Sequence, residues 1–129
     1  MIISRGIMYM EATEMIRRKN EYRNEIREHM RGGDGQVLID NLFEKDELLG
    51  RSRMLSRLTL EPGCGVGMHQ HDNEQEYFYI IKGNPVYYDD DEEIQLYEGD
   101  STLCEDGHSH GIANRSDETV EILACILLK

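Results

Sequence analysis

Two histidines and a glutamate stand close together near the middle of this 129-residue sequence, with types and spacing that suit a metal site. His69 and His71 are separated by one residue, and residues i and i+2 of a strand point to the same face. Glu76 follows at an odd offset, which an unbroken strand would place on the opposite face. Asp72-Asn73 is a good turn dipeptide, so we expect the chain to reverse there and return Glu76 to the same interior.

A third imidazole is needed to complete such a site, and His108 and His110 are the candidates apart from His29, to which we assign no role. They follow a second glycine-bounded strand and approach the first pair if the strands close up. Three imidazoles and one carboxylate form a mixed donor set that suits a divalent Mn, Fe, Co, Ni, Cu or Zn ion. An octahedral ion would keep two positions open for substrate or O₂, whereas zinc could be closed off as a tetrahedron.

The run that follows the turn predicts one wall of a pocket. Glu76, Phe78 and Ile80 share a face in a strand, which gives a carboxylate followed by an apolar wall, as ligand pockets usually have. Four nearby tyrosines are expected to pack the sheets instead: Tyr77, Tyr79, Tyr87 and Tyr88.

Short apolar stretches separated by glycine turns predict a mostly β protein, a sandwich or closed barrel, with no βαβ rhythm. The expected strands are 36–41, 53–61, 76–82, 85–89, 94–97, 101–104, 110–114 and 119–128. The last of them is apolar on both faces, so a second sheet or a partner chain is expected to cover it. The acidic cluster 89–93 lacks the spacing and glycine of a calcium loop and is expected to be a solvated hairpin turn.

Residues 1–35 differ in composition from the rest of the chain. Residues 1–35 are expected to form an arm that packs on the barrel or on a partner, and residues 36–129 to form the barrel domain. The mostly charged stretch 11–30 fits either a short helix or an extended arm. The glycine cluster 31–35 ends any regular element.

Composition excludes several classes of protein. A net charge of −12 argues against nucleic-acid and membrane-surface partners. No apolar run approaches the ~20 residues of a membrane span, and we expect no signal peptide. Three widely spaced cysteines, Cys64, Cys104 and Cys125, argue against a disulfide framework or a thiolate zinc site and fit a cytoplasmic protein.

The histidine window resembles the first motif of the cupin superfamily, Gly-x5-His-x-His-x3,4-Glu-x6-Gly. The matching residues are Gly63, His69, His71, Glu76 and Gly83.

The second cupin motif, Gly-x5-Pro-x-Gly-x2-His-x3-Asn, is matched at Gly99, Gly107, His110 and Asn114. Glu105 replaces the proline of this motif, which puts the loop geometry before His110 in doubt more than the ligand spacing.

The resemblance implies an antiparallel double-stranded β-helix, the cupin jelly-roll barrel, with an N-terminal arm or short helix. It implies that His69, His71, Glu76 and His110 are the ligands of one divalent transition metal ion. His108 does not match the motif and could be a pocket group or a surface histidine. Small cupins are usually dimers, so a homodimer is implied as well.

Two functional hypotheses follow from the resemblance. The first is a metal-dependent enzyme acting on a small polar substrate as a dioxygenase, decarboxylase, isomerase or lyase, with the metal chelating and polarising the substrate. The second is a non-catalytic module that binds or senses a small ligand or metal. No general base is identifiable, and this fold supports many chemistries.

Overall fold

The computed structural model describes residues 15–129, and these form ten strands and two short 3₁₀ turns. The elements are β1 (Arg23–Glu28), η2 (Met30–Gly32), β2 (Gln36–Phe43), η3 (Lys45–Glu47), β3 (Ser52–Leu60), β4 (Gly65–Gln70), β5 (Glu74–Lys82), β6 (Val86–Asp89), β7 (Glu92–Gln95), β8 (Ser101–Cys104), β9 (Ser109–Ala113) and β10 (Val120–Leu128). No helix within residues 15–129 is long and apolar enough to cross a membrane.

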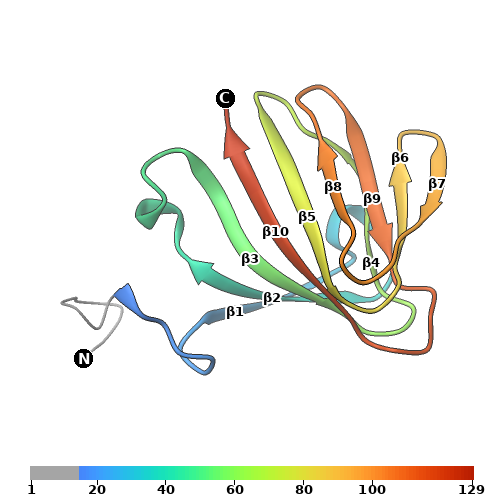
Figure 1. Cartoon of the computed structure of the whole chain (residues 1–129), viewed down its shortest axis with the longest axis horizontal. Coiled ribbons are helices and arrows are strands. Elements are labelled where there is room, and N and C mark those ends of the chain that lie inside the picture. Colours follow the sequence, from blue (N-terminus) through green and yellow to red (C-terminus); the bar gives the residue numbers. More distant parts are fainter. Residues whose placement is uncertain (1–14) are drawn as a thin grey trace.

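The strands form two antiparallel sheets (Figure 1). The larger has the order β1-β2-β3-β10-β5-β8, and the smaller has the order β4-β9-β6-β7. From β3 onward, consecutive strands alternate between the two sheets, except for the hairpin β6–β7. This alternation is the jelly-roll connectivity, and it brings segments that are far apart in sequence to one interior.

The core lies between the two sheets and contains side chains from both. Strand β5 illustrates its period of two: Glu76, Phe78 and Ile80 are buried, whereas Tyr79 and Ile81 are exposed. The predicted inner face of this strand is therefore confirmed. Strand β10 lies at the centre of the large sheet, where it pairs with both β3 and β5.

The sequence predicts most of the strands, with ends shifted by a few residues. Range 101–104 coincides with β8, whereas β7 begins and ends two residues earlier than expected. The acidic cluster forms the β6–β7 turn, as predicted, and Asp90 there has a φ of 51°. Strand β4 was implied by the histidine spacing, although its bounds were not predicted.

The charged stretch before the barrel is extended where the structure describes it. Residues 23–28 form β1, which pairs along its whole length with β2, while residues 11–14 lie outside the described part of the chain. An edge strand of this kind is held by backbone hydrogen bonds and needs no continuous apolar face, which is why periodicity did not distinguish it from a helix. The domain boundary at residues 35 and 36 stays a prediction.

Residues 29–35, which we call the strap, connect β1 to β2 and cross over β4. The strap closes on itself, since His29 N–H donates to Gly35 O at 2.8 Å, and it is tied to β4 by Gly65 N–H donating to Asp34 O at 2.9 Å. Glycines permit the crossing: a Cβ on Gly67 would overlap the carbonyl oxygen of Arg31. A Cβ on Gly33 would likewise overlap Gly65 O, so the glycine cluster 31–35 serves close packing as well as the turn.

The outward face of the large sheet carries apolar side chains. Those that are exposed include Tyr79, Leu103 and Leu127, with Leu123 and Cys125 half-buried beside them. The predicted covering of β10 by a second sheet is thus present on its inner face only. Whether a second copy covers the outer face stays a prediction.

Gly67→Ala tests the crossing of the strap over β4. The added methyl group would meet backbone atoms of Arg31 and Gly33, which cannot move independently, so the free energy of unfolding should fall by about 1–3 kcal/mol. Urea denaturation measures it. The neighbouring Met68→Ala, at an exposed position, should stay within about 0.5 kcal/mol of the native protein. Equal stability of the Gly67 variant would contradict the close packing.

Arg53→Gln tests an ion pair that joins β3 to β5 across β10. Two guanidinium nitrogens of Arg53 lie 2.7 Å from Glu74, and this contact is the main reason that the pKa of Glu74 is lowered to about 2. Because the folded-state pKa is depressed, the stabilisation is complete above the unfolded value near 4.5 and is lost as the pH falls toward 2.

In metal-free protein, Arg53→Gln should therefore cost about 1 kcal/mol at neutral pH, a partly exposed pair being screened by water. The cost should shrink steadily as unfolding is repeated at lower pH. Arg51→Gln is the matched control, since Arg51 is exposed and has no ion pair within residues 15–129. If the loss of unfolding free energy in Arg53→Gln did not change with pH, it would not come from the ion pair with Glu74.

Candidate metal centre

His69 and His110 come from different hairpins but are cross-strand neighbours. Strand β4 pairs with β9 in an antiparallel register that places His69 directly opposite His110. Side chains of directly opposed residues project from the same face, so the register alone brings these two imidazoles together. Their ring centroids are 4.7 Å apart. Spacing within either motif cannot give this pairing, which arises from barrel closure.

His71 lies just beyond β4 and is fixed by the turn that precedes β9. Its N–H donates to His108 O at 3.1 Å, and its carbonyl accepts from Gly107 N–H at 2.7 Å. The turn closes through His108 N–H donating to Glu105 O at 3.0 Å, with Gly107 at a φ of 88°. The turn thus forms with glutamate in the proline position of the motif.

Glu76 reaches the same point because the chain reverses after His71. Asn73 adopts a φ of 63°, a left-handed conformation that asparagine tolerates better than most residues. Its N–H donates to Asp106 Oδ1 at 2.6 Å, so this reversal is braced by the opposite turn. The predicted turn at Asp72-Asn73 is confirmed, and β5 then carries Glu76 inward.

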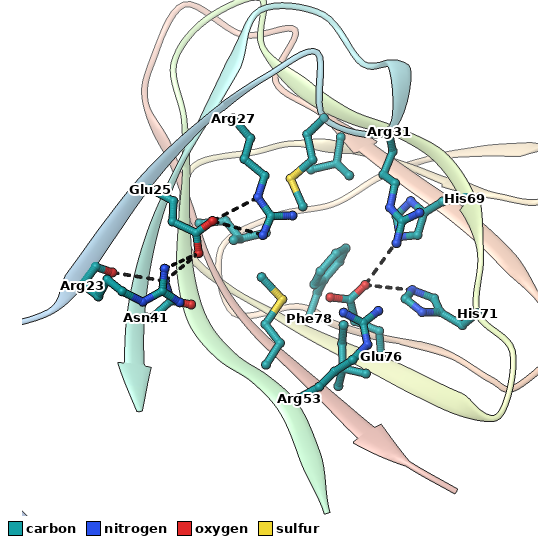
Figure 2. A pocket seen from close by; sticks show the side chains of 15 residues that line it. Arg23, Glu25, Arg27, Arg31, Asn41, Arg53, His69, His71, Glu76 and Phe78 are labelled. Carbon is teal, nitrogen blue, oxygen red and sulfur yellow. Dashed lines mark hydrogen bonds and ion pairs between the residues drawn. The ribbon is translucent and has the colours of Figure 1, made fainter. Parts of the chain in front are cut away.

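The four side chains converge on one carboxylate oxygen. Glu76 Oε1 lies 3.0 Å from His71 Nε2, 2.9 Å from His110 Nε2 and 3.7 Å from His69 Nε2. One possible ligand atom from each residue lies within 4.8 Å of the others. Figure 2 shows His69, His71 and Glu76 directed toward one another at one side of a cavity.

Each imidazole is held from behind through its other nitrogen. Nδ1 of His69 lies 2.8 Å from Gly67 O, and Nδ1 of His110 lies 2.8 Å from the hydroxyl of Tyr87. Nδ1 of His71 lies 2.5 Å from Glu74, the carboxylate that Arg53 also binds. Such contacts fix the orientation of metal-binding histidines and leave all three Nε2 atoms directed at the centre.

The electrostatics favour an ionised carboxylate among the imidazoles. Burial alone raises the pKa of Glu76, but hydrogen bonds from His110, His69 and His71 outweigh it and hold the pKa well below its usual range. Burial lowers the pKa of His110, whereas the contact with Glu76 raises the pKa of His71. Ionised carboxylate and neutral imidazole are the forms that bind metal, so a metal would displace a proton shared by this cluster.

These residues fit a transition metal ion by their donor chemistry and their orientation. Three Nε2 atoms and one carboxylate oxygen form a set common to Mn, Fe, Co, Ni, Cu and Zn sites. Three of the four residues are buried and His69 is nearly so, which limits competition from water. The cluster could therefore hold a metal ion.

A cavity of about 120 Å³ opens beside the cluster. His69, His71 and Glu76 line it, together with Phe78, whose ring stacks on His110 at 5.0 Å between centroids. Four arginines from three different segments also line it: Arg23, Arg27, Arg31 and Arg53. The cavity thus combines a candidate metal site with guanidinium groups.

Two other predicted pocket residues lie elsewhere. Ile80 is fully buried within the core and does not line the cavity. His108 is exposed in the turn before β9, and its Nδ1 lies 3.6 Å from Asp90. Because β9 begins at Ser109, the i, i+2 relation with His110 does not apply, and His108 points away from the cluster.

The sequence did not single out several residues that surround the cluster. Tyr87 was expected to pack the sheet, and it does so while contacting His110. Glu74, Arg53 and Arg31 were not singled out, because their roles depend on contacts between distant segments. Only the even spacing of Glu74 and Glu76 on one strand hinted that both face inward.

Comparison with known proteins agrees with this fold and this cluster. A family model described as the cupin domain matches residues 56–126, more than half of the chain. The chain is 36% identical over 118 residues to the oxalate-binding protein of Thermotoga maritima, an alignment that covers 92% of this chain and 98% of that protein.

Solved structures show the same architecture. The crystal structure of a predicted oxalate decarboxylase from Thermotoga maritima has a TM-score of 0.86 at 35% identity, covering 89% of this chain and 100% of that one. A sugar phosphate isomerase of the cupin superfamily from Silicibacter pomeroyi, 20% identical over 88% of this chain and 76% of that one, shares the fold with a TM-score of 0.72. The chain belongs to the cupin family.

Proposed function

We propose that this protein binds one divalent transition metal ion through His69, His71, Glu76 and His110, and binds a small carboxylate anion such as oxalate on that ion. The observation that carries the anion is the set of arginines beside the cluster. The protein has a net charge of −12, whereas four guanidinium groups gather positive charge around this one cavity. Guanidinium groups suit carboxylates, since they donate two parallel hydrogen bonds.

The related proteins support the same class of ligand. One relative is an oxalate-binding protein, and one similar structure is that of a predicted oxalate decarboxylase. The cavity volume of about 120 Å³ suits a ligand of only a few non-hydrogen atoms. An ion that accepts six ligands would keep two positions for such an anion, so the proposal requires an ion of this kind and not a closed tetrahedral site.

When bound, the metal would supply a positive charge and a Lewis acid for the ligand oxygens. The chain's own residues would fix the geometry: Tyr87 and Glu74 hold two of the imidazoles, and Phe78 forms an apolar wall. Glu76 would remain ionised because three imidazoles surround it.

Turnover of the anion by decarboxylase, dioxygenase, isomerase or lyase chemistry is the second candidate. It would require a group that gives or takes a proton near the ligand. The carboxylates lining the cavity within residues 15–129 are Glu76, in the cluster, and Glu25, whose pKa is lowered chiefly by a hydrogen bond from Asn41. Glu76 would be held by the metal ion, and Glu25 is bonded to Asn41, Arg23 and Arg27. Neither carboxylate is free to exchange a proton with the ligand, so the described residues favour binding over proton-dependent turnover.

A homodimer is part of this proposal, with a second copy on the outward face of β5, β8 and β10. The exposed apolar side chains of that face would be removed from water by such an interface. This outward face lies on the other side of β5 from the cavity, so dimerisation would leave the four candidate ligands accessible.

The metal site is tested by alanine variants of two ligands from different hairpins. His69→Ala and His110→Ala should each lower bound metal from one ion per chain to a small fraction, measured by elemental analysis of protein purified without added metal. His108→Ala should retain full metal, since His108 is exposed and outside the cluster. Unchanged metal in either ligand variant would defeat the assignment.

The same preparations test the ligand. Calorimetric titration with oxalate should give binding to metal-loaded native protein and none after removal of the metal with a chelator. Product analysis after long incubation separates binding from turnover, because release of CO₂ or formate would establish the second candidate. Oxalate binding that survives metal removal would contradict the proposed site.

Tyr87→Phe tests the support behind His110. Removing the hydroxyl leaves Nδ1 without its 2.8 Å partner, and loss of such a contact should weaken metal affinity about 10–100-fold. Competition with a coloured chelator measures the affinity. Tyr88→Phe on the same strand is the matched control, because Tyr88 packs under Arg115 and has no contact with the cluster. Equal metal affinity in the two variants would show that the Tyr87 hydroxyl does not support His110.

A further inference from the structure

Arg31 differs from the other three arginines of the cavity in its partners. Arg23 and Arg27 both pair with Glu25, at 3.0 and 3.1 Å (Figure 2). Arg53 pairs with Glu74 on β5 at 2.7 Å. Within residues 15–129, no carboxylate pairs with Arg31 and its side chain makes no hydrogen bond. Arg31 is therefore the cavity arginine whose guanidinium donors are all available to a ligand within the described part of the chain.

The backbone at Arg31 is held in an unfavourable conformation. Arg31 has a φ of 54°, in the left-handed region that non-glycine residues rarely adopt. His29, two residues earlier in the strap, has a φ of 51°. Such conformations persist where the surroundings impose them, and they concentrate at ligand-binding sites. Here they direct the Arg31 side chain into the cavity rather than along the outer surface.

The strap fixes Arg31 relative to the metal ligands. The Arg31 carbonyl oxygen lies against Gly67, where any side chain would collide with it, and Gly67 is two residues before His69 on β4. Gly33 N–H donates to Met30 O at 2.9 Å, which closes the turn around Arg31. The position of Arg31 is thus coupled to the strand that carries His69. In Figure 2 its side chain extends toward the metal ligands, away from Glu25.

We propose that Arg31 binds the carboxylate of the anion that the metal ion does not hold. Arg31 would thereby select dicarboxylates over monocarboxylates. One carboxylate would bind the metal ion, and the other would accept two hydrogen bonds from the guanidinium. This inference rests on the proposed function and deepens it. It assigns ligand selection to a residue outside the matched range 56–126, which contains all four metal-ligand candidates.

The ordinary alternative is that Arg31 is a solvated surface arginine near the cavity mouth. Its exposed side chain is consistent with that alternative. The two assignments differ in their consequences for ligand choice. A solvated arginine would change affinity for every anion by a similar small factor, whereas a recognition residue would change the ratio between a dicarboxylate and a monocarboxylate.

The test compares full-length native protein with Arg31→Gln and Arg31→Lys, each loaded with Mn²⁺ and checked for metal content. Calorimetric titrations with oxalate and with formate give the two affinities. Arg31→Gln should keep its metal and lose about 10–100-fold in oxalate affinity, the effect of removing a charged hydrogen-bond partner. Formate affinity should change much less, so the oxalate-to-formate ratio should fall. Arg31→Lys should be intermediate, because an ammonium keeps the charge without the planar fork.

Arg18→Gln is the charge-matched control, because Arg18 is exposed and does not line the cavity. It should behave as the native protein with both anions. An Arg31→Gln variant with native oxalate affinity, or with both affinities lowered equally, would overturn the role of Arg31 while leaving the metal-bound anion intact. Native protein that holds Mn²⁺ but binds neither anion would overturn the proposed function and this inference with it.

Discussion

The buried carboxylate of Glu76 is the constraint on which the rest of this structure depends. An ionised carboxylate that is only 4% exposed is costly unless charged or polar groups surround it. His71 and His110 supply the closest contacts, and His110 comes from a hairpin 34 residues further along the chain. The two sheets must close for this pairing to exist, so burial of Glu76 and closure of the barrel are coupled.

The supports of the cluster extend this coupling outward in three directions. His71 is linked through Glu74 to Arg53 on β3, and His110 is linked to Tyr87 on β6. The third support needs no side chain, because His69 contacts the carbonyl of Gly67, the residue that the strap crosses. Strands from both sheets and the strap therefore share the task of orienting three imidazoles. Because the three imidazoles are already oriented, the cluster would need little rearrangement to accept an ion.

The sequence predicted the four residues that cluster here because local rules decide most of their placement. The spacing of His69 and His71, followed by a turn at Asn73, was sufficient to bring Glu76 inward. Spacing alone left His108 and His110 equivalent, and the family motif was needed to choose between them. The structure gives the physical reason, since β9 begins between these two residues and only His110 has a cross-strand partner in the cluster. Ile80 lies deeper than the cavity because the same face of the strand continues past the cavity into the core.

What the sequence could not predict depends on segments that meet only in the folded chain. Periodicity is uninformative for β1, which is mostly polar on both faces, and so the sequence left a short helix and an extended arm as equal alternatives for the element that precedes the strap. Yet the strap passes over the strand that bears His69 and contributes Met30 and Arg31 to the cavity lining. The four candidate ligands all lie within range 56–126 and pack against one another, whereas a cavity wall supplied by a crossing loop can change its side chains without disturbing them. Under the proposed function, a changed side chain in the segment that precedes the barrel would alter the choice of anion and leave the four candidate ligands in place.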